Sequence, residues 1–322
     1  MNKPAATSEW VIDQETGERL DKWLARPEIL GSRSKAKIAL ERGRVFLNEQ
    51  EAAIADAGRL LQKGDKIRLW LDRPGTARAA PKGSPHRSGL WIIYEDDDFL
   101  VINKPAGLLV HPLDNEESGA TLIDMVQEYM RPRGKRKPQL VHRIDRDTSG
   151  LVIFAKNGKT QELLKSQFEQ RKPERVYLAI VHGIVKPTAG TWKDKLTSSK
   201  KVIKQQLARD NDPNAKLAIS NYKVLEQFAD AALLEVKLVT GKRNQIRIQA
   251  GLRGYPLIGE RQYVYTDVGQ SPVPKLDRQA LHAYKLVIEH PGSGKPLAFE
   301  APLPEDTTRL LEKLRKSAKS KK

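Results

Sequence analysis

Hydrophobic and polar positions near the start of the chain predict two short helices followed by two short strands. Leu20, Trp23 and Leu24 are spaced as on one face of a helix, which predicts a helix in ERLDKWLA. A second helix is predicted from Ser34, whose hydroxyl can cap it, to Gly43. The segments RVFLNE and DKIRLWL then alternate apolar and polar residues as strands do.

Longer apolar runs dominate the rest of the chain. LWIIYEDDDFLVINKP reads as a hairpin around an acidic turn, and LVIFA, VYLAIVHG, SNYKVLEQF and ALLEVKLVT read as further strands. Helices are predicted in TLIDMVQEYM, in KTQELLKSQFEQ and in NQIRIQAGLRGYP, which Gly254 ends with Pro256 beyond it. Strands in neighbouring pairs with few helices between them predict an α+β fold with a mixed, mainly antiparallel sheet. No glycine-rich phosphate loop follows a strand, so no nucleotide cofactor is expected.

One polar segment divides these two regions. Residues 73–89 are rich in Pro, Gly, Ser, Ala and basic residues with almost no apolar side chain, which predicts a flexible basic linker. The linker separates a small domain at residues 17–72 from a large one at residues 90–306. Residues 1–16 are expected to form an N-terminal tail, and residues 307–322 a basic, disordered C-terminal tail.

The composition limits the classes of partner and of site that can be expected. The 322 residues are 39% hydrophobic and 30% charged, an ordinary globular balance, but the net charge is +17. Such an excess favours a nucleic acid or an anionic membrane surface as partner, although solubility alone can also explain it. The absence of cysteine removes disulfides, thiolate zinc sites and a thiol nucleophile. The six histidines are scattered, so no metal is expected, and the lack of long apolar runs predicts a cytoplasmic protein without membrane contact.

The segment HRIDRDTSG at residues 142–150 is the strongest candidate for chemistry. Two aspartates, two arginines and a histidine precede the apolar run LVIFA, so the acids lie at the end of a buried strand. A carboxylate held there can act as a nucleophile or a base when a cation orients it. An internal salt-bridge cluster would give the same composition, and at this point both interpretations stay open.

The small domain contains a cluster of basic residues. Runs of charge are often only a solvated face, but this order of elements resembles the αL-type (S-four type) RNA-binding module of a ribosomal protein and several tRNA synthetases. The resemblance rests on RLD, SRS, GRVFLN and GD, in that order. In that family the second helix and the adjoining loop contact RNA phosphates, which give affinity and little sequence information. The resemblance implies five RNA-binding residues here: Arg33, Lys35, Lys37, Arg42 and Arg44.

The large domain resembles a second family over nearly its whole length. HRIDRDTSGLVIFAKN is similar to the signature of the RluA-type pseudouridine synthases. Four further segments match the family in the same order. IIYEDDDFLVINKPAGLLVHP precedes this signature, and three segments follow it: ERVYLAIVHG, TGKRNQIRIQAGLRGYPLIGERQY and RQALHAYKLVIEHPGSG. Five such matches in register make the resemblance specific.

This resemblance implies an enzyme that isomerises uridine to pseudouridine within RNA and needs no cofactor. Asp145 is then the catalytic aspartate, and Tyr177 lies against the detached uracil. Arg247 pairs with Asp145 and favours its ionised form, because an opposite charge nearby stabilises a carboxylate. Arg143 is expected to contact a phosphate or the flipped nucleotide. Without the resemblance, Tyr177 would be assigned to the core and Arg247 to the solvated surface.

Several positions depart from the family pattern or carry smaller expectations. Ile144 replaces a leucine, Asn244 and Gln249 stand where the family generally has histidines, and Glu260 replaces an aspartate. We expect these changes to affect RNA contacts and the support of Arg247 more than the chemistry. Bracing of the loop or a place near the RNA is expected for three further residues: Lys104, Asp147 and His282.

The expected partner is structured RNA bound by a monomer. Family members with this N-terminal module mostly modify large-subunit ribosomal RNA, so that is the expected substrate, with tRNA as the alternative. A catalytically silent RNA-binding or ribosome-assembly factor on the same scaffold is the rival class of function. A nucleoside hydrolase would want two carboxylates flanking the bond that it cleaves.

Overall fold

The computed structural model divides the chain into two compact units, residues 1–82 and 83–322. It describes residues 7–41, 43–70, 89–112, 119–131, 137–198, 205–209, 211–265 and 273–319. Most of the predicted linker at residues 73–89, and Arg42 of the predicted RNA-binding residues, therefore lie outside the described residues.

The N-terminal unit is a small antiparallel sheet covered by short helices. Its strand order is β1-β4-β2-β3, and Leu20, Trp23 and Leu40 pack into one core with the buried strand residues. The strands are β1 (Thr7–Val11), β2 (Val45–Leu47), β3 (Gln50–Glu51) and β4 (Lys66–Trp70). The helices are α1 (Leu20–Leu24), α2 (Arg33–Glu41) and the 3₁₀-helix η1 (Ile54–Gly58).

Two expectations for this unit need correction. Part of the expected tail at residues 1–16 is strand β1, which pairs with β4 from Thr7 to Val11, and the adjoining Ile12 is only 5% exposed. An apolar residue there gains by covering the core, so the domain begins before residue 17. Helix α2 is capped by Ser32, whose Oγ accepts from the Lys35 N–H at 3.3 Å, and not by Ser34.

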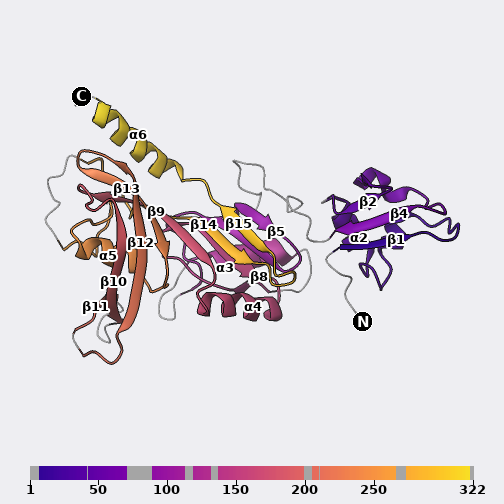
Figure 1. Cartoon of the computed structure of the whole chain (residues 1–322), viewed down its shortest axis with the longest axis horizontal. Helices are drawn as coiled ribbons and strands as arrows, with labels where there is room; N and C mark the ends of the chain where they lie inside the picture. Colours follow the sequence, from indigo (N-terminus) through magenta and orange to yellow (C-terminus); the bar gives the residue numbers. More distant parts are fainter. Residues whose placement is uncertain are drawn as a thin grey trace. The chain divides into compact units, whose positions relative to one another are not determined.

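The second unit is built on one eleven-stranded sheet (Figure 1). Its main order is β11-β10-β12-β13-β9-β14-β8-β6-β5, while β15 pairs with β14 and β7 with β8. Only β8 and β14 run parallel among the described strands, so the predicted α+β class with a mainly antiparallel sheet is confirmed. The strands are β5 (Ile92–Glu95), β6 (Phe99–Lys104), β7 (Gln139–Leu140), β8 (Ser149–Ala155), β9 (Glu174–His182), β10 (Ala189–Ser198), β11 (Gln205–Leu207), β12 (Lys216–Gln227), β13 (Ala231–Leu238), β14 (Leu281–Glu289) and β15 (Pro296–Glu300).

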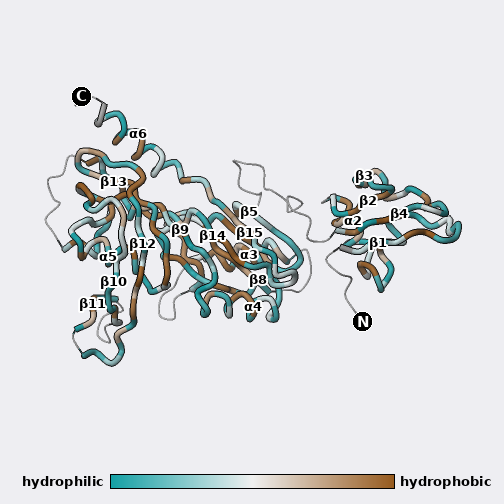
Figure 2. Tube along the Cα trace, in the orientation of Figure 1, coloured by the Kyte–Doolittle hydropathy of each residue, from teal (hydrophilic) through white to brown (hydrophobic). Residues whose placement is uncertain are grey.

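Helices cover both faces of this sheet. Successive residues of β8 enter different cores: Val152 packs in a cluster with α3, and Ile153 in a cluster with α4. Because neighbouring side chains of a strand point to opposite faces, α3 and α4 lie on opposite sides. Strands buried on both faces read as continuous apolar runs, which explains LVIFA, and Figure 2 shows hydrophobic residues gathered around β8 and β14. The helices are α3 (Leu122–Met130), α4 (Gly158–Glu169), α5 (Gln245–Leu252) and α6 (Glu305–Lys319).

The C-terminal segment is ordered further than its composition predicts. Residues 307–322 were expected to form a disordered basic tail, but α6 continues to Lys319. Leu310, Leu311 and Leu314 lie on one side of α6 and are at most 5% exposed, packed with Ile180 and other residues of the sheet. Burial of three leucines stabilises the helix by several kcal/mol, roughly 2 for each, which outweighs the repulsion among its charges.

The parallel contact between β8 and β14 is unusually close. It comprises two residue pairs, Ser149 with His282 and Gly150 with Ala283, and β15 then takes the same edge of β14. Gly150 has a φ of 113°, and a Cβ added there would come within 2.3 Å of the Ala283 carbonyl oxygen. Only glycine fits this position, so the end of the loop before β8 is held directly against β14.

Gly150→Ala is expected to lower the free energy of unfolding by about 3 kcal/mol, because the methyl group overlaps backbone that cannot rotate away. Gly158→Ala is the matched control: it opens α4, has no atom within 4 Å of an added Cβ, and favours the helix. Urea unfolding of both variants checks this. Equal stability of the two would contradict the close contact.

Candidate active site

The loop between β7 and β8 carries the charged segment, and buried cations hold its backbone. Lys104, at the end of β6, is 0% exposed. Its ammonium donates to the carbonyl oxygens of Pro105, Leu108 and Arg146, each at 2.8 Å. Burial lowers the pKa of Lys104 to about 7, but three acceptors need three N–H donors, which only the charged form supplies. Lys104 is thus a bracing residue for the loop.

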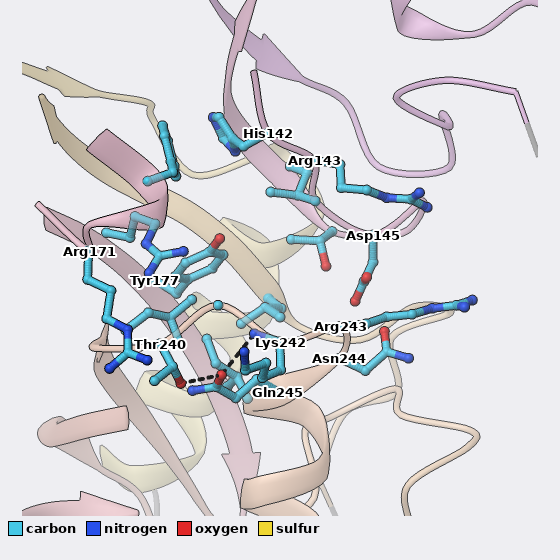
Figure 3. Close-up of a pocket in the computed structure, with 18 of the residues that line it drawn as sticks. His142, Arg143, Asp145, Arg171, Tyr177, Thr240, Lys242, Arg243, Asn244 and Gln245 are labelled. Carbon is cyan, nitrogen blue, oxygen red and sulfur yellow. Dashed lines mark hydrogen bonds between the residues drawn. The ribbon is translucent and has the colours of Figure 1, made fainter. Parts of the chain in front are cut away.

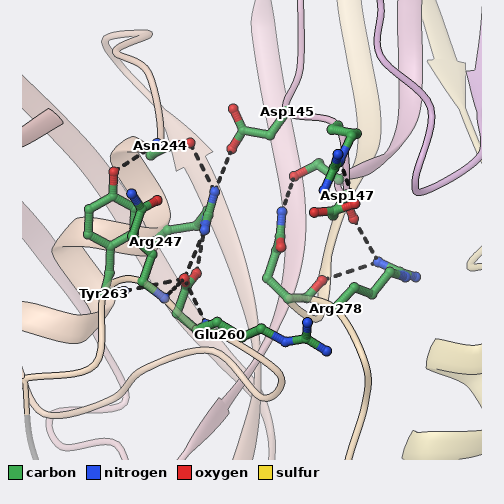
Figure 4. A network of polar contacts seen from close by, with 12 residues as sticks. Asp145, Asp147, Asn244, Arg247, Glu260, Tyr263 and Arg278 are labelled. Atoms are coloured by element: carbon green, nitrogen blue, oxygen red, sulfur yellow. Dashed lines mark hydrogen bonds and ion pairs between the residues drawn. The ribbon is translucent and has the colours of Figure 1, made fainter. Parts of the chain in front are cut away.

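A second cation braces the loop from the other side. Arg278 donates to the carbonyl oxygen of Asp147 at 3.3 Å and forms a two-point ion pair with Asp306 at the start of α6, at 2.7 and 2.8 Å. The backbone N–H of Thr148 donates to the Asp145 carbonyl at 3.2 Å, which closes a turn. These contacts fix where the Asp145 side chain leaves the backbone (Figure 4).

Asp145 and Arg247 meet across the site, as the sequence predicts. Arg247 lies on α5, and its Nη1 is 3.5 Å from Oδ2 of Asp145. The Asp145 side chain keeps 27% of its surface exposed, whereas Arg247 keeps 13%. The carboxylate is therefore reachable from solvent, and the guanidinium is a partly buried neighbour, not a solvated surface residue.

Arg247 has a stronger partner than Asp145. Its Nε and Nη2 donate to the two oxygens of Glu260 at 2.6 and 2.8 Å, and Glu260 is fully buried. Burial alone would raise the pKa of Glu260, but the hydrogen bonds and charge of Arg247 outweigh it and leave that pKa lowered. Two parallel bonds of this kind fix the plane of the guanidinium. Glu260, noted in the sequence only as a replaced aspartate, thus sets the position of Arg247.

Asn244 completes this framework. It caps α5 with a left-handed φ of 55°, accepts from Arg247 Nη1 at 3.0 Å and donates to the Tyr263 hydroxyl at 2.8 Å. Arg247 also lies over the Tyr263 ring, 5.1 Å from its centre. The expectation that Asn244 affects the support of Arg247 therefore agrees with the geometry (Figure 4). Gln249 instead bonds to Ser220 and Asp194 within the sheet.

The electrostatics of Asp145 differ in one respect from the sequence prediction. Burial raises the pKa of Asp145, and the cations Arg247, Arg243 and Arg143 oppose this only in part. Arg247 favours the ionised form as expected, but most of its charge is directed at Glu260. The carboxyl group therefore binds a proton more tightly than an exposed aspartate, which suits a base or a nucleophile.

Asp145 and Tyr177 line the same cleft, which has a volume of about 640 Å³ (Figure 3). Tyr177 is in the central strand β9 and packs against the cores on both sides of it. Burial raises the pKa of Tyr177, Arg175 lowers it, and Asp145 raises it further. Tyr177 is thus a neutral phenol at neutral pH, with a ring available for stacking.

His142 and Arg143 occupy the upper edge of the cleft in Figure 3. His142 accepts from the Ile153 N–H at 3.2 Å and stacks on Phe168 with ring centres 4.7 Å apart. Burial and the charge of Arg175 lower the pKa of His142 to about 3, so it stays neutral. Arg143 is exposed, with its Nη1 2.6 Å from His111 Nε2, and can reach a ligand in the cleft.

Four other cations of the cleft were not predicted: Arg171, Arg175, Lys242 and Arg243. In ERVYLAIVHG, a basic residue two positions before the tyrosine could have indicated that Arg175 belongs to the site. Arg171 and Lys242 are placed in the cleft by the fold, Arg171 just after the end of α4 and Lys242 in the loop before α5, and no sequence pattern indicated them. His282, expected to be structural or near RNA, is buried and bonds to Ser149 and Ala301 at 2.9 and 3.0 Å.

The predicted RNA-binding residues of the N-terminal unit differ in their exposure to solvent. Arg33, Lys35 and Lys37 are exposed on α2, and a weak ion pair at 4.0 Å links Lys37 to Glu41. Arg44, in contrast, is only 6% exposed. Little of this residue is open to a phosphate, and its role in RNA binding stays a prediction.

Cofactor and membrane chemistry can be addressed only for the part of the chain that the structure describes. There, no three histidine, aspartate or glutamate side chains are grouped to hold a metal ion. No described helix has both the length and the apolar composition that crossing a bilayer requires.

Known proteins are similar to this chain in sequence and in fold. Residues 98–251 match the family model of RNA pseudouridylate synthases. An RNA pseudouridine synthase of Bacillus subtilis is 35% identical over 95% of this chain and 97% of its own length. Ribosomal large subunit pseudouridine synthase D of Neisseria meningitidis is 34% identical over 94% of this chain and 80% of its own.

A solved structure is similar in fold. Human RNA Pseudouridylate Synthase Domain Containing 4 superposes on 70% of this chain and 93% of its own with a TM-score of 0.58, at 24% identity. That likeness supports the fold, and the near full-length sequence matches extend it to the family. The cleft with its acid, phenol and guanidinium lies in a chain that belongs to the RNA pseudouridine synthase family.

Proposed function

We propose that this enzyme converts uridines of large-subunit ribosomal RNA to pseudouridine with Asp145 as the catalytic aspartate. The observation that carries the site assignment is that Asp145 and Tyr177 line one cleft, with the Asp145 carboxylate partly exposed and 3.5 Å from Nη1 of Arg247. The substrate is supported by relatives named ribosomal large subunit pseudouridine synthase D in Neisseria meningitidis and Vibrio cholerae. tRNA is the alternative substrate.

The reaction needs one carboxylate and a confined base. The bond from C1′ of the ribose to N1 of uracil breaks, the base turns, C5 bonds to C1′, the proton of C5 leaves and N1 gains one. Asp145 acts on the ribose, either by attack at C1′ or by removal of a sugar proton. Tyr177 stacks on the free uracil and keeps it in the cleft. The uridine must leave its RNA stack to reach this depth.

The Arg247–Glu260 pair explains how Asp145 stays reactive. A guanidinium bound only to Asp145 would hold that carboxylate in a tight ion pair. Because Glu260 takes two of its donors at 2.6 and 2.8 Å, Arg247 orients Asp145 through a longer 3.5 Å contact. Arg247 is in this scheme a positioning residue that also limits protonation of Asp145.

The N-terminal unit supplies RNA affinity in this proposal. Arg33, Lys35 and Lys37 present three positive charges on the exposed side of α2, as in the αL-type modules that the sequence resembles. Phosphate contacts of this kind add affinity without reading bases. They would hold a large structured RNA while the second unit acts on one nucleotide.

Asp145→Asn is expected to reduce release of tritium from RNA labelled at C5 of uridine by about 10³-fold or more, because the amide cannot act as base or nucleophile. Asp147→Asn, two residues along the same loop, is the matched control and should retain activity. Transcripts of ribosomal RNA and tRNA, tested side by side, identify the substrate. Equal release by the wild type and Asp145→Asn would contradict the site, and no release by the wild type would favour a silent RNA binder.

Glu260→Gln should lower the free energy of unfolding by about 3 kcal/mol, because it leaves Arg247 as a partly buried charge without its main partner. Turnover should also fall about tenfold to a hundredfold as Arg247 loses its orientation. Glu260→Asp keeps the charge and should lose less of both. Urea unfolding and tritium release measure the two effects. A fully active Glu260→Gln enzyme would show that Arg247 needs no such anchor.

A chain that begins at Leu90 is expected to bind structured RNA more weakly while its turnover of a short, saturating substrate changes little. The second unit contains the whole cleft and its own cores. Filter binding and tritium release separate affinity from chemistry. If the truncated and full-length proteins bind the RNA equally well, the N-terminal unit has no role in affinity.

A further inference from the structure

We propose that Arg171, Arg175 and Lys242 form a phosphate subsite in the cleft, which takes a backbone phosphate of the RNA strand next to the reacting uridine. The inference rests on the proposed function and deepens it. All three residues line the cleft that contains Asp145. Figure 3 shows Arg171 on the far side of Tyr177 from Asp145. Three observations on these cations support the subsite.

The first observation is the backbone of Arg171, which has a φ of 58°. It follows α4, where its N–H donates to the Phe168 carbonyl at 3.1 Å and the Lys172 N–H donates to the Gln167 carbonyl at 3.0 Å. Helices that end with these two bonds usually place glycine in the left-handed position, because a side chain is strained there. An arginine at this point costs stability, and strain of this kind is concentrated at functional sites.

The second observation is one unpaired nitrogen, Nε, in the guanidinium of Arg175. Its Nε is buried and has no hydrogen-bond partner. The side chain packs over the Phe168 ring, 5.8 Å from its centre, and against Gly241, where an added Cβ would come within 2.3 Å of Nη1. Burial lowers the pKa of Arg175 and so does Arg171, whereas Tyr177 raises it. A buried donor without a partner is costly unless a ligand satisfies it.

The third observation is the concentration of like charge. Burial lowers the pKa of Lys242, and Lys216 and Arg171 lower it further. Among the described residues, no carboxylate lies within 4.0 Å of the Arg171, Arg175 or Lys242 side-chain nitrogens. Glu169 also lines the cleft, but it is exposed and forms no ion pair in the described part of the chain. Repulsion among three cations is relieved when an anion binds between them.

The charge of the subsite selects phosphate over a base carbonyl. A uracil oxygen is neutral and needs one or two donors, whereas three cations without a counter-charge match a phosphodiester. The cleft of about 640 Å³ has room for more than one nucleotide. With uracil on Tyr177 and ribose at Asp145, a neighbouring linkage of the strand occupies the cationic end. This contact would hold the strand extended on both sides of the flipped residue.

Arg171→Gly tests the subsite without risk to folding. Glycine suits a φ of 58°, so the melting temperature should stay equal or rise by about 1–3 °C. Affinity for a short single-stranded RNA with one uridine should nevertheless fall about fivefold at 0.1 M salt, the value of one lost phosphate contact. The measurement uses full-length protein with Asp145→Asn, so that binding is measured without turnover.

The salt dependence identifies the ligand group. The slope of log affinity against log salt should become smaller by about 0.7 in Arg171→Gly. Lys165→Gln, an exposed cation of α4 outside the cleft, is the control for net charge and should keep the wild-type slope. Lys242→Gln should behave as Arg171→Gly does. Equal slopes for Arg171→Gly and Lys165→Gln would overturn the phosphate assignment, as would weaker binding with an unchanged slope, which indicates a neutral carbonyl.

A neutral linkage locates the contact. In this experiment, the phosphates that flank the uridine are replaced one at a time by a methylphosphonate. One of these replacements should weaken binding to the Asp145→Asn protein, but should not weaken binding to the same protein with Arg171→Gly. If every replacement weakens both proteins equally, no subsite exists at these residues. Since this experiment measures binding alone, it can fail while tritium release still assigns Asp145, and the reverse also holds.

Discussion

The ion pair between Arg247 and Glu260 determines how the site is charged. Its two bonds of 2.6 and 2.8 Å bury an acid completely beside a guanidinium that keeps 13% of its surface. Burying both charges is expensive, and the pair is retained at a net cost that a hydrophobic replacement would avoid. In return, the guanidinium of Arg247 is held in a fixed position, and only its Nη1 side is left to interact with a further carboxylate. Asp145 lies on that side, close enough to be oriented and far enough to keep its proton affinity.

The sheet places this pair opposite the acid. Asp145 comes from the loop before β8 and Arg247 from α5, and the strands β14 and β9 lie between these elements. Gly150 lets β8 approach β14, while Lys104 and Arg278 hold the backbone of the loop. The main chains that carry the reacting groups are therefore held by hydrogen bonds and by a close strand contact. Such rigidity is what a reaction with a detached base requires, because the base must find the sugar again.

Patterns in the sequence were sufficient for elements with strong periodicity or long apolar runs. The hairpin of β5 and β6, the buried strand β8 and helices α3 to α5 follow from them. Strand β1 was missed because its few apolar residues adjoin a polar start, and α6 because its charges hide three leucines on one side. The burial of Arg44 was not expected, because arginines are rarely buried.

The site shows the same division between local and distant information. Asp145, Tyr177 and Arg247 were assigned through a family resemblance, since nothing in the spacing of residues 102 positions apart brings Asp145 and Arg247 together. The roles of Glu260 and Asn244 depend on the fold around α5 and could only be noted as departures. The left-handed Arg171 could not be anticipated, because local rules expect glycine there.

The pairing of β8 with β14 also sets an order of events during synthesis of the chain. Ser149 and His282, which bond across this pair, are 133 residues apart. The ribosome must therefore deliver β14 before the loop of Asp145 acquires its final neighbour. The N-terminal unit, in contrast, is formed by the first 82 residues and can fold early. A nascent chain can thus complete its first module well before the last segment that lines the cleft, at Leu281, has been made.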